Sequence, residues 1–163
     1  MAAKTEQLQI RIAPAQHAAL RRRARAAGLD VSEDVLARVL PPEHGRFVAL
    51  LGRLGEESDR RFALAELHDL LRSCAPAQFP EAVATADLHG LPTWLQNYVA
   101  AMVEQAAAQK GVAPPLWTRE VAPLEEPHFA TPLRSLRLHL LLAAPAAFKR
   151  RNIFVDAGVG ARA

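Results

Sequence analysis

The start of the chain combines one amphipathic strand pattern with two helix patterns, and this combination limits the possible folds most. Residues 6–12 alternate strictly, with Leu8, Ile10 and Ile12 on one face and polar side chains on the other. A period of two over seven residues predicts a strand with one buried face. The segment offers this strand no partner, and about 40 residues bury too little surface to fold alone. We therefore predict that two copies of the chain pair through this strand.

Two helices are predicted after the strand, over residues 15–27 and 31–40. Pro14 suits the first turn of the first helix, and Gly28 suits the left-handed conformation that ends it. Asp30 and the glutamate three residues later have the spacing of a capping box. A proline pair follows, so the sequence predicts an N-terminal module over residues 1–41 and a linker over 42–45.

Residues 5–40 closely resemble the ribbon-helix-helix DNA-binding proteins, the class of the Arc, MetJ and CopG repressors. The shared features are the IRI strand, the proline after it, the LRRRA run, the glycine turn and the VSE start of the second helix. Two positions depart from the family pattern: Gln16 stands where an apolar residue is more common, and Asp30 where serine or threonine is usual. The resemblance implies an intertwined dimer with a transcriptional role, and this module is common in antitoxins.

The outward face of the predicted strand carries Gln7, Gln9 and Arg11. Two paired strands fit the major groove of DNA, where glutamine can pair with adenine and arginine with guanine. Ser32 lies at the start of the second helix, where free backbone amides and the helix dipole favour a phosphate. We predict that these four residues contact DNA. The alternative is an ordinary polar strand face beside a routine capping residue.

The net charge of +3 conceals two basic ends around an acidic middle. Residues 1–29 and residues 131–163 each carry a net charge of +5, whereas residues 30–130 carry −7. Basic ends favour polyanionic partners. The arginines of residues 21–25 either extend a phosphate contact or form a solvated helix face, and the second interpretation is favoured because this helix generally lies away from the groove in the family.

Residues 46–163 are predicted to form a separate, all-helical domain that binds a partner. Apolar residues recur at helical spacing over 60–74 and 91–110, and residues 133–142 predict a final buried helix. Five prolines between positions 111 and 132 predict an irregular segment. The expected fold is therefore mainly α, with a ribbon-helix-helix module (one strand and two helices, paired in an intertwined dimer) before this domain.

The end of the predicted domain carries a basic segment between aromatic residues. The candidate partner-binding residues are Phe148, Lys149, Arg150, Arg151 and Phe154. A basic strip with hydrophobic anchors suits a protein partner with an acidic cleft, although a charged loop after the last helix would look the same. The apolar helix faces of the domain are an equal alternative for binding the partner. The segment from Pro145 to Phe154 also resembles a P-x-x-F-[KR]-R-R-N-I-F motif of bacterial domains that accompany nucleotidyltransferase-like toxins.

The sequence carries no recognisable catalytic constellation, so we predict no enzyme activity, no catalytic residue, no metal and no cofactor. The six histidines are dispersed, and Cys74, the one cysteine, lies on an apolar helix face and is predicted to be a core residue. No apolar run approaches the roughly 18 residues of a membrane helix, and the first residues lack the apolar core of a signal peptide. These features predict a cytoplasmic protein with no membrane contact.

Three functions are compatible with these patterns. The first is an antitoxin of a type II toxin–antitoxin system, which binds operator DNA as a homodimer or a higher oligomer and neutralises a cognate toxin through residues 46–163. The second is a ribbon-helix-helix transcriptional regulator whose C-terminal domain binds an effector or only oligomerises. The third, an enzyme domain behind a DNA-binding module, is disfavoured by the missing motifs. The neighbouring gene distinguishes the first from the second.

Overall fold

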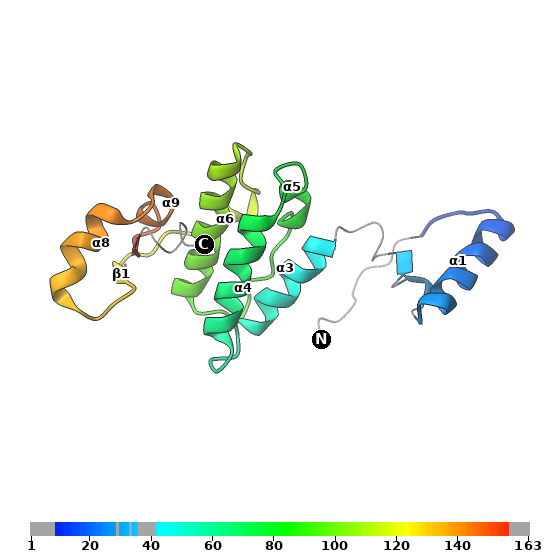
Figure 1. Cartoon of the computed structure of the whole chain (residues 1–163), viewed down its shortest axis with the longest axis horizontal. Helices are drawn as coiled ribbons and strands as arrows, with labels where there is room; N and C mark the ends of the chain where they lie inside the picture. The colour runs from blue at the N-terminus through cyan, green and yellow to red at the C-terminus, as the bar shows by residue number, and fades with distance from the viewer. Residues whose placement is uncertain (1–8, 29, 33, 36–41, 157–163) are drawn as a thin grey trace. The chain divides into compact units, whose positions relative to one another are not determined.

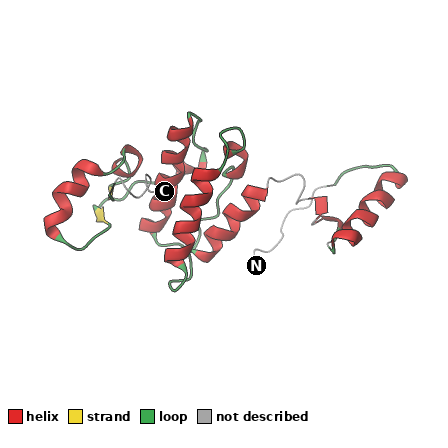
Figure 2. Cartoon of the chain, in the orientation of Figure 1, coloured by secondary structure: helices red, strands yellow, loops and turns green. Residues whose placement is uncertain are grey.

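The computed structural model describes residues 9–28, 30–32, 34–35 and 42–156 (Figure 1). The chain divides into two compact units, Met1–Leu40 and Pro41–Ala163. The described residues are mainly helical, as the sequence predicts (Figure 2). Among the described helices, none has the length and apolar character that crossing a membrane requires.

The first unit contains helix α1, Pro14–Ala27, which confirms the first predicted helix. Gln16 Oε1 accepts a hydrogen bond of 2.9 Å from the backbone N–H of Ala13, so this departure from the family pattern holds the start of the helix. Gly28 has φ 69°, and its N–H donates to the carbonyls of Ala24 and Arg25. That left-handed conformation suits glycine, as predicted from the sequence.

The predicted strand over residues 6–12 is not seen where the structure describes it. Residues 9–12 have no regular secondary structure, and the side chains of Ile10 and Ile12 are 65% and 41% exposed. A strand is held by hydrogen bonds to a neighbouring strand, and the two strands found among the described residues pair with each other elsewhere. Residues 31–32 and 34–35 are helical. The remainder of the second predicted helix lies largely outside the described residues.

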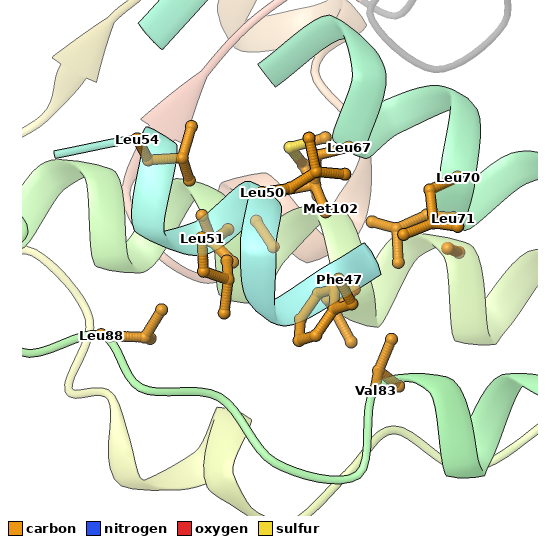
Figure 3. Close-up of a cluster of buried hydrophobic side chains, with 14 of the residues drawn as sticks. Phe47, Leu50, Leu51, Leu54, Leu67, Leu70, Leu71, Val83, Leu88 and Met102 are labelled. Carbon is orange, nitrogen blue, oxygen red and sulfur yellow. The ribbon is translucent and has the colours of Figure 1, made fainter. Parts of the chain in front are cut away.

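The second unit is built on three helices that pack side by side: α3, Pro42–Arg53; α4, Arg60–Ser73; and α6, Thr93–Lys110 (Figure 1). The predicted helices over 60–74 and 91–110 are thereby confirmed. Their apolar side chains meet in one core, together with the short helix α5, Phe79–Ala82 (Figure 3). Fully buried members of this core include Phe47, Leu54, Leu67, Phe79, Leu95, Val99 and Val103.

The predicted linker over residues 42–45 is wrong, because these residues form the first turn of α3. Proline lacks a backbone N–H, but the first turn of a helix leaves its N–H groups unpaired, so a helix can begin at Pro42. His44 fixes this turn to the rest of the unit, with its Nδ1 atom 3.1 Å from the carbonyl oxygen of Ala82.

The proline-rich segment after α6 is mostly irregular, as predicted, and begins where Gly111 ends the helix with φ 68°. It contains a short helix, α7, Trp117–Glu120, and a short strand, β1, His128–Phe129. Strand β1 pairs in parallel with β2, Ile153–Phe154. The prediction of an all-helical second domain is therefore wrong in this detail. Strands of two residues are too short to leave an alternating pattern in the sequence.

The last predicted helix is present, but its expected burial is wrong. Residues 134–143 form a 3₁₀ turn, η1, Arg134–Leu136, and helix α8, Arg137–Ala143; helix α9, Ala146–Lys149, follows. Leu140 is buried, whereas the other leucines of this segment are exposed: Leu133, Leu136, Leu138, Leu141 and Leu142. Apolar spacing shows which residues a helix groups together, but not whether anything within the chain covers them.

Candidate functional site

The residues predicted to bind DNA lie at the surface of the first unit where the structure describes them. Gln9 and Arg11 are exposed in the segment before α1, and Ser32 is exposed in the helical turn after Gly28. Gln7 lies outside the described residues. No hydrogen bond or ion pair between described residues joins these side chains, and each is accessible at the surface.

Helix α1 adds further exposed cations to the same unit. Arg21, Arg22, Arg23 and Arg25 are all exposed, in agreement with a solvated helix face. Such a cluster raises the positive potential around the unit and attracts polyanions.

The candidate partner-binding segment begins in α9, and the structure separates its five residues. Arg151 is buried rather than exposed, with 6% of its side-chain surface accessible. Its Nη2 atom lies 2.6 Å from Glu104 Oε1 of α6 and also donates to the carbonyl oxygen of Thr118. Its Nη1 atom donates to Asn97 Oδ1 at 3.2 Å and to the carbonyl oxygen of Val121 at 2.9 Å. Arg151 is thus part of a buried polar network that supports the fold.

The same network holds the proline-rich segment against α6. The wholly buried Asn97 donates from Nδ2 to the carbonyl oxygens of Thr93, at 3.1 Å, and Ala122, at 3.0 Å. Asn152 has φ 59°, and its Nδ2 atom donates to the carbonyl oxygens of Leu124 and Glu125, each at 3.2 Å. These side-chain amides donate to backbone carbonyls that an irregular segment does not pair within itself, so they tie the segment to the fold.

The two aromatic residues of the segment are also committed to the fold. Phe148 is buried, with its ring edge-on to Tyr98 and 5.3 Å between the ring centres. Burial raises the pKa of Tyr98. Phe154 is half-buried and stacks on Phe129, with 5.1 Å between ring centres. The expectation of one exposed strip with aromatic anchors is therefore wrong.

Only the two remaining cations of the predicted strip are exposed. Lys149 Nζ donates to the carbonyl oxygen of Leu142 at 2.9 Å, near the end of α8. Arg150 is 69% exposed along its side chain, with Nη2 3.9 Å from Glu104 Oε2. The chain turns directly after α9, which sends Arg150 outward and Arg151 inward.

Sequence reasoning missed the two inward partners of Arg151. Asn97 and Glu104 lie on α6 among apolar residues, and Glu104 retains only 12% of its side-chain surface. Glu104, the one acid of α6, with Asn97 about two turns earlier among apolar residues, is the signal that was available. Such groups are rarely buried without a partner, so they call for a donor from elsewhere in the chain.

Beside α9, the second unit presents an apolar surface bordered by cations. Leu138, Leu141 and Leu142, hereafter the α8 face, are 68%, 41% and 74% exposed. Arg134 and Arg137 are exposed in the same stretch of chain. The guanidinium of Arg137 lies 4.8 Å from the centre of the Phe129 ring, which holds this cation in place.

The second unit also contains an open hollow of about 360 Å³, within the range of small-ligand pockets. Its lining residues are Ala86, Leu88, His89, Thr93, Gln96, Trp117, Glu120, Val121 and Ala122. Cys74, correctly predicted as a core residue, is buried beside another hollow, and burial raises the pKa of its thiol. Within the described ranges, no three His, Cys, Asp or Glu side chains are grouped to hold a metal ion.

The described geometry therefore offers two kinds of surface. One is the exposed polar and basic surface of the first unit, and the other is the α8 face with its cations. Comparison of the chain with protein-family models, with curated proteins and with solved structures finds no match. Functional conclusions accordingly depend on these surfaces and on the sequence patterns.

Proposed function

We propose that this protein is an antitoxin that binds its own operator DNA through the first unit and neutralises a toxin through the second. One observation carries the proposal: a well-packed helical unit leaves three leucines of one short helix exposed beside arginines. Contiguous exposed apolar groups bordered by polar ones are typical of protein–protein interaction sites. A protein that only bound DNA would need no such surface.

The DNA-binding half of the proposal is supported by the ribbon-helix-helix resemblance and by the exposed cations of the first unit. Ile10 and Ile12 are exposed in the single chain, which is what a strand face requires if it is covered in a dimer. We expect Ile10→Asp to abolish dimer formation, because it would bury a charge at the strand pair at a cost of several kcal/mol. Light scattering on the full chain measures the mass. An Ile10→Asp variant that remains a dimer would contradict strand pairing.

Operator binding is tested with DNA from upstream of the gene. The triple variant Gln7→Ala, Gln9→Ala and Arg11→Ala should lose specific binding, and Arg11→Ala alone should weaken it by about 1–3 kcal/mol. Arg22→Ala is the comparison variant: this exposed arginine on α1 lies outside the predicted strand, so its loss should weaken binding to all DNA alike without changing the sequence preference. Binding should fall steeply with salt. Unchanged operator affinity in the triple variant would refute the assignment.

Toxin neutralisation is tested with the product of the adjacent gene. We expect the full chain to copurify with this product and to restore growth when the two are co-expressed. A toxin that transfers nucleotides would hold metal-binding carboxylates, so its acidic cleft would suit the exposed Lys149 and Arg150. A neighbouring product that neither copurifies with the chain nor inhibits growth would exclude the antitoxin function.

The hollow beside Trp117 favours a second candidate, a transcriptional regulator that binds a small effector. Such a regulator would bind no toxin, and its affinity for the operator would change when the ligand binds. Ligand binding at this hollow should alter the fluorescence of Trp117, which can be isolated in a Trp94→Phe background because the chain has two tryptophans. A ligand response together with failure of the copurification test would favour the regulator.

A further inference from the structure

We propose that the α8 face is the docking surface for the toxin, and that the matching toxin surface is an apolar groove with an acidic rim. This inference rests on the proposed antitoxin function and names the site through which it acts. It replaces the exposed aromatic strip that the sequence predicted, since Phe148 and Arg151 are buried.

Helix α8 exposes three of its four leucines to solvent. Leu138, Leu141 and Leu142 have the i, i+3 and i+4 spacing that places side chains on one side of a helix. Leu140 lies about 200° around the helix from Leu138 and is 5% exposed, so it anchors α8 to the unit. An isolated surface helix normally shows the opposite arrangement, with polar residues outward.

The rest of the unit holds this helix in a defined position. Lys149 donates from Nζ to the carbonyl oxygen of Leu142, which satisfies a carbonyl near the C-terminal end of α8. His139 Nε2 lies 3.3 Å from Asp156 Oδ2, and Arg137 packs over the ring of Phe129. The helix has only seven residues and would not form alone, so these contacts preorganise the exposed leucines.

The charges around the α8 face determine what kind of partner it accepts. The exposed side chains of the surrounding segments include four cations: Arg134, Arg137, Lys149 and Arg150. Asp156, an exposed carboxylate after β2, has its Oδ2 atom 3.3 Å from Nε2 of His139. A partner with acidic groups around an apolar centre would therefore be attracted and oriented here.

The same charges disfavour the occupants that the chain itself supplies. In a twofold pairing of two copies through the α8 face, the same cations would oppose each other across the interface. The first unit of the chain is also a poor occupant, because residues 1–29 carry a net charge of +5. A nucleic acid would gain from the cations but not from the leucines. An anionic lipid surface would use both, so vesicle binding is tested below as a competing occupant.

The test compares Leu138→Glu/Leu142→Glu with Leu116→Glu in the full chain, using the purified product of the adjacent gene as the probe. Leu116 is 72% exposed, close to the 74% of Leu142, and lies outside the α8 face. We expect the double variant to bind the probe at least about 100-fold more weakly than the unmodified chain, because substitutions at the centre of an interface cost the most affinity. The affinity of Leu116→Glu should stay within about twofold of that of the unmodified chain. Arg134→Glu should slow association, most strongly at low salt.

Folding and competing occupants are controlled in the same experiment. Circular dichroism and urea unfolding of each variant test whether the fold is retained. We expect it to be retained, because the substituted side chains are exposed. Light scattering detects self-association, and flotation with phosphatidylglycerol–phosphatidylcholine vesicles detects lipid binding. A self-association or a vesicle binding that the double variant alone loses would assign the α8 face to that occupant and overturn the proposal.

The remaining outcomes separate this inference from the antitoxin function. If the unmodified chain binds the probe and the double variant binds equally well, the α8 face is not the docking surface although the antitoxin function stands. If the unmodified chain does not bind the probe, the antitoxin function fails, and the docking inference fails with it. Selective loss in the double variant supports both.

Discussion

Replacing Arg151 with alanine should destabilise the second unit strongly, and the structure allows the size of the effect to be worked out. The guanidinium is 2.6 Å from Glu104 Oε1, and their side chains retain 6% and 12% of their surface. Removing one member of a buried ion pair costs about 3–5 kcal/mol, because the other charge is left buried without its partner. The main cost of Arg151→Ala is therefore the stranded carboxylate of Glu104.

Neutral groups add to this cost. Asn97 Oδ1 and the carbonyl oxygens of Thr118 and Val121 would each lose a donor. An unsatisfied buried acceptor costs about 1–3 kcal/mol. The costs of the individual lost hydrogen bonds do not simply add within one network, and water can enter the vacated space. We expect a total loss of about 4 kcal/mol, a large part of the roughly 5–15 kcal/mol that stabilises a domain.

Urea unfolding followed by tryptophan fluorescence measures this loss directly. Both tryptophans, Trp94 and Trp117, lie in the second unit, so the signal reports on that unit. With a urea dependence of about 2 kcal/mol per molar, the midpoint should fall by about 2 M. Arg150→Ala is the matched control: it removes the neighbouring arginine, which is 69% exposed, and should cost under about 0.5 kcal/mol.

Two further variants test the cause of the effect. Arg151→Lys retains the charge but loses the forked geometry of the guanidinium. Its free energy of unfolding should therefore lie between those of the unmodified chain and Arg151→Ala. A double-mutant cycle with Glu104→Gln should show a coupling free energy of at least about 1 kcal/mol. A loss below about 1 kcal/mol for Arg151→Ala, or an equal loss for Arg150→Ala, would refute the assignment of Arg151 to the fold.

Three other predictions concern stability and use the same unfolding measurement. Burial lowers the pKa of His128, so the unfolded chain binds a proton near pH 6.5 more readily than the folded chain does. The free energy of unfolding should therefore fall as the pH drops below about 6.5. The variant His128→Phe should show a smaller fall between about pH 7.5 and 5.5. Gly111→Ala should cost about 1 kcal/mol because φ is 68°, whereas Gly52→Ala, within α3, should stabilise by about 0.5–1 kcal/mol. Phe47→Ala should cost about 3–5 kcal/mol because this side chain is fully buried, and Phe62→Ala, 69% exposed, should cost under about 1 kcal/mol.

The helices of the second unit were predictable because their apolar periodicity is long and their ends carry strong signals. Helix α6 spans 18 residues and ends at Gly111, which has the left-handed conformation expected of it. The start of α3 was not predictable in the same way. A proline can end one helix or begin the next. The proline pair in the sequence therefore does not indicate at which residue α3 begins.

The candidate site was less predictable because local patterns do not determine which side chains turn inward. Lys149, Arg150 and Arg151 are chemically similar and adjacent, but the turn after α9 buries one of them. That choice depends on Glu104, which lies 47 positions away in the sequence. Helix α8 shows the same limit for apolar residues, because its spacing is typical of a core helix although three of its leucines are exposed.

The basic C-terminal region is thus divided by the structure into two roles. Arg151 is neutralised by Glu104 inside the fold, so its charge contributes little to an external field. The cations available to a partner are those around the α8 face, where Arg134 and Arg137 lie next to exposed leucines in the chain. A loss of toxin binding in an Arg151 variant would therefore follow from the loss of folded protein. Substitutions at Leu138 and Leu142 should instead reduce binding while stability is retained.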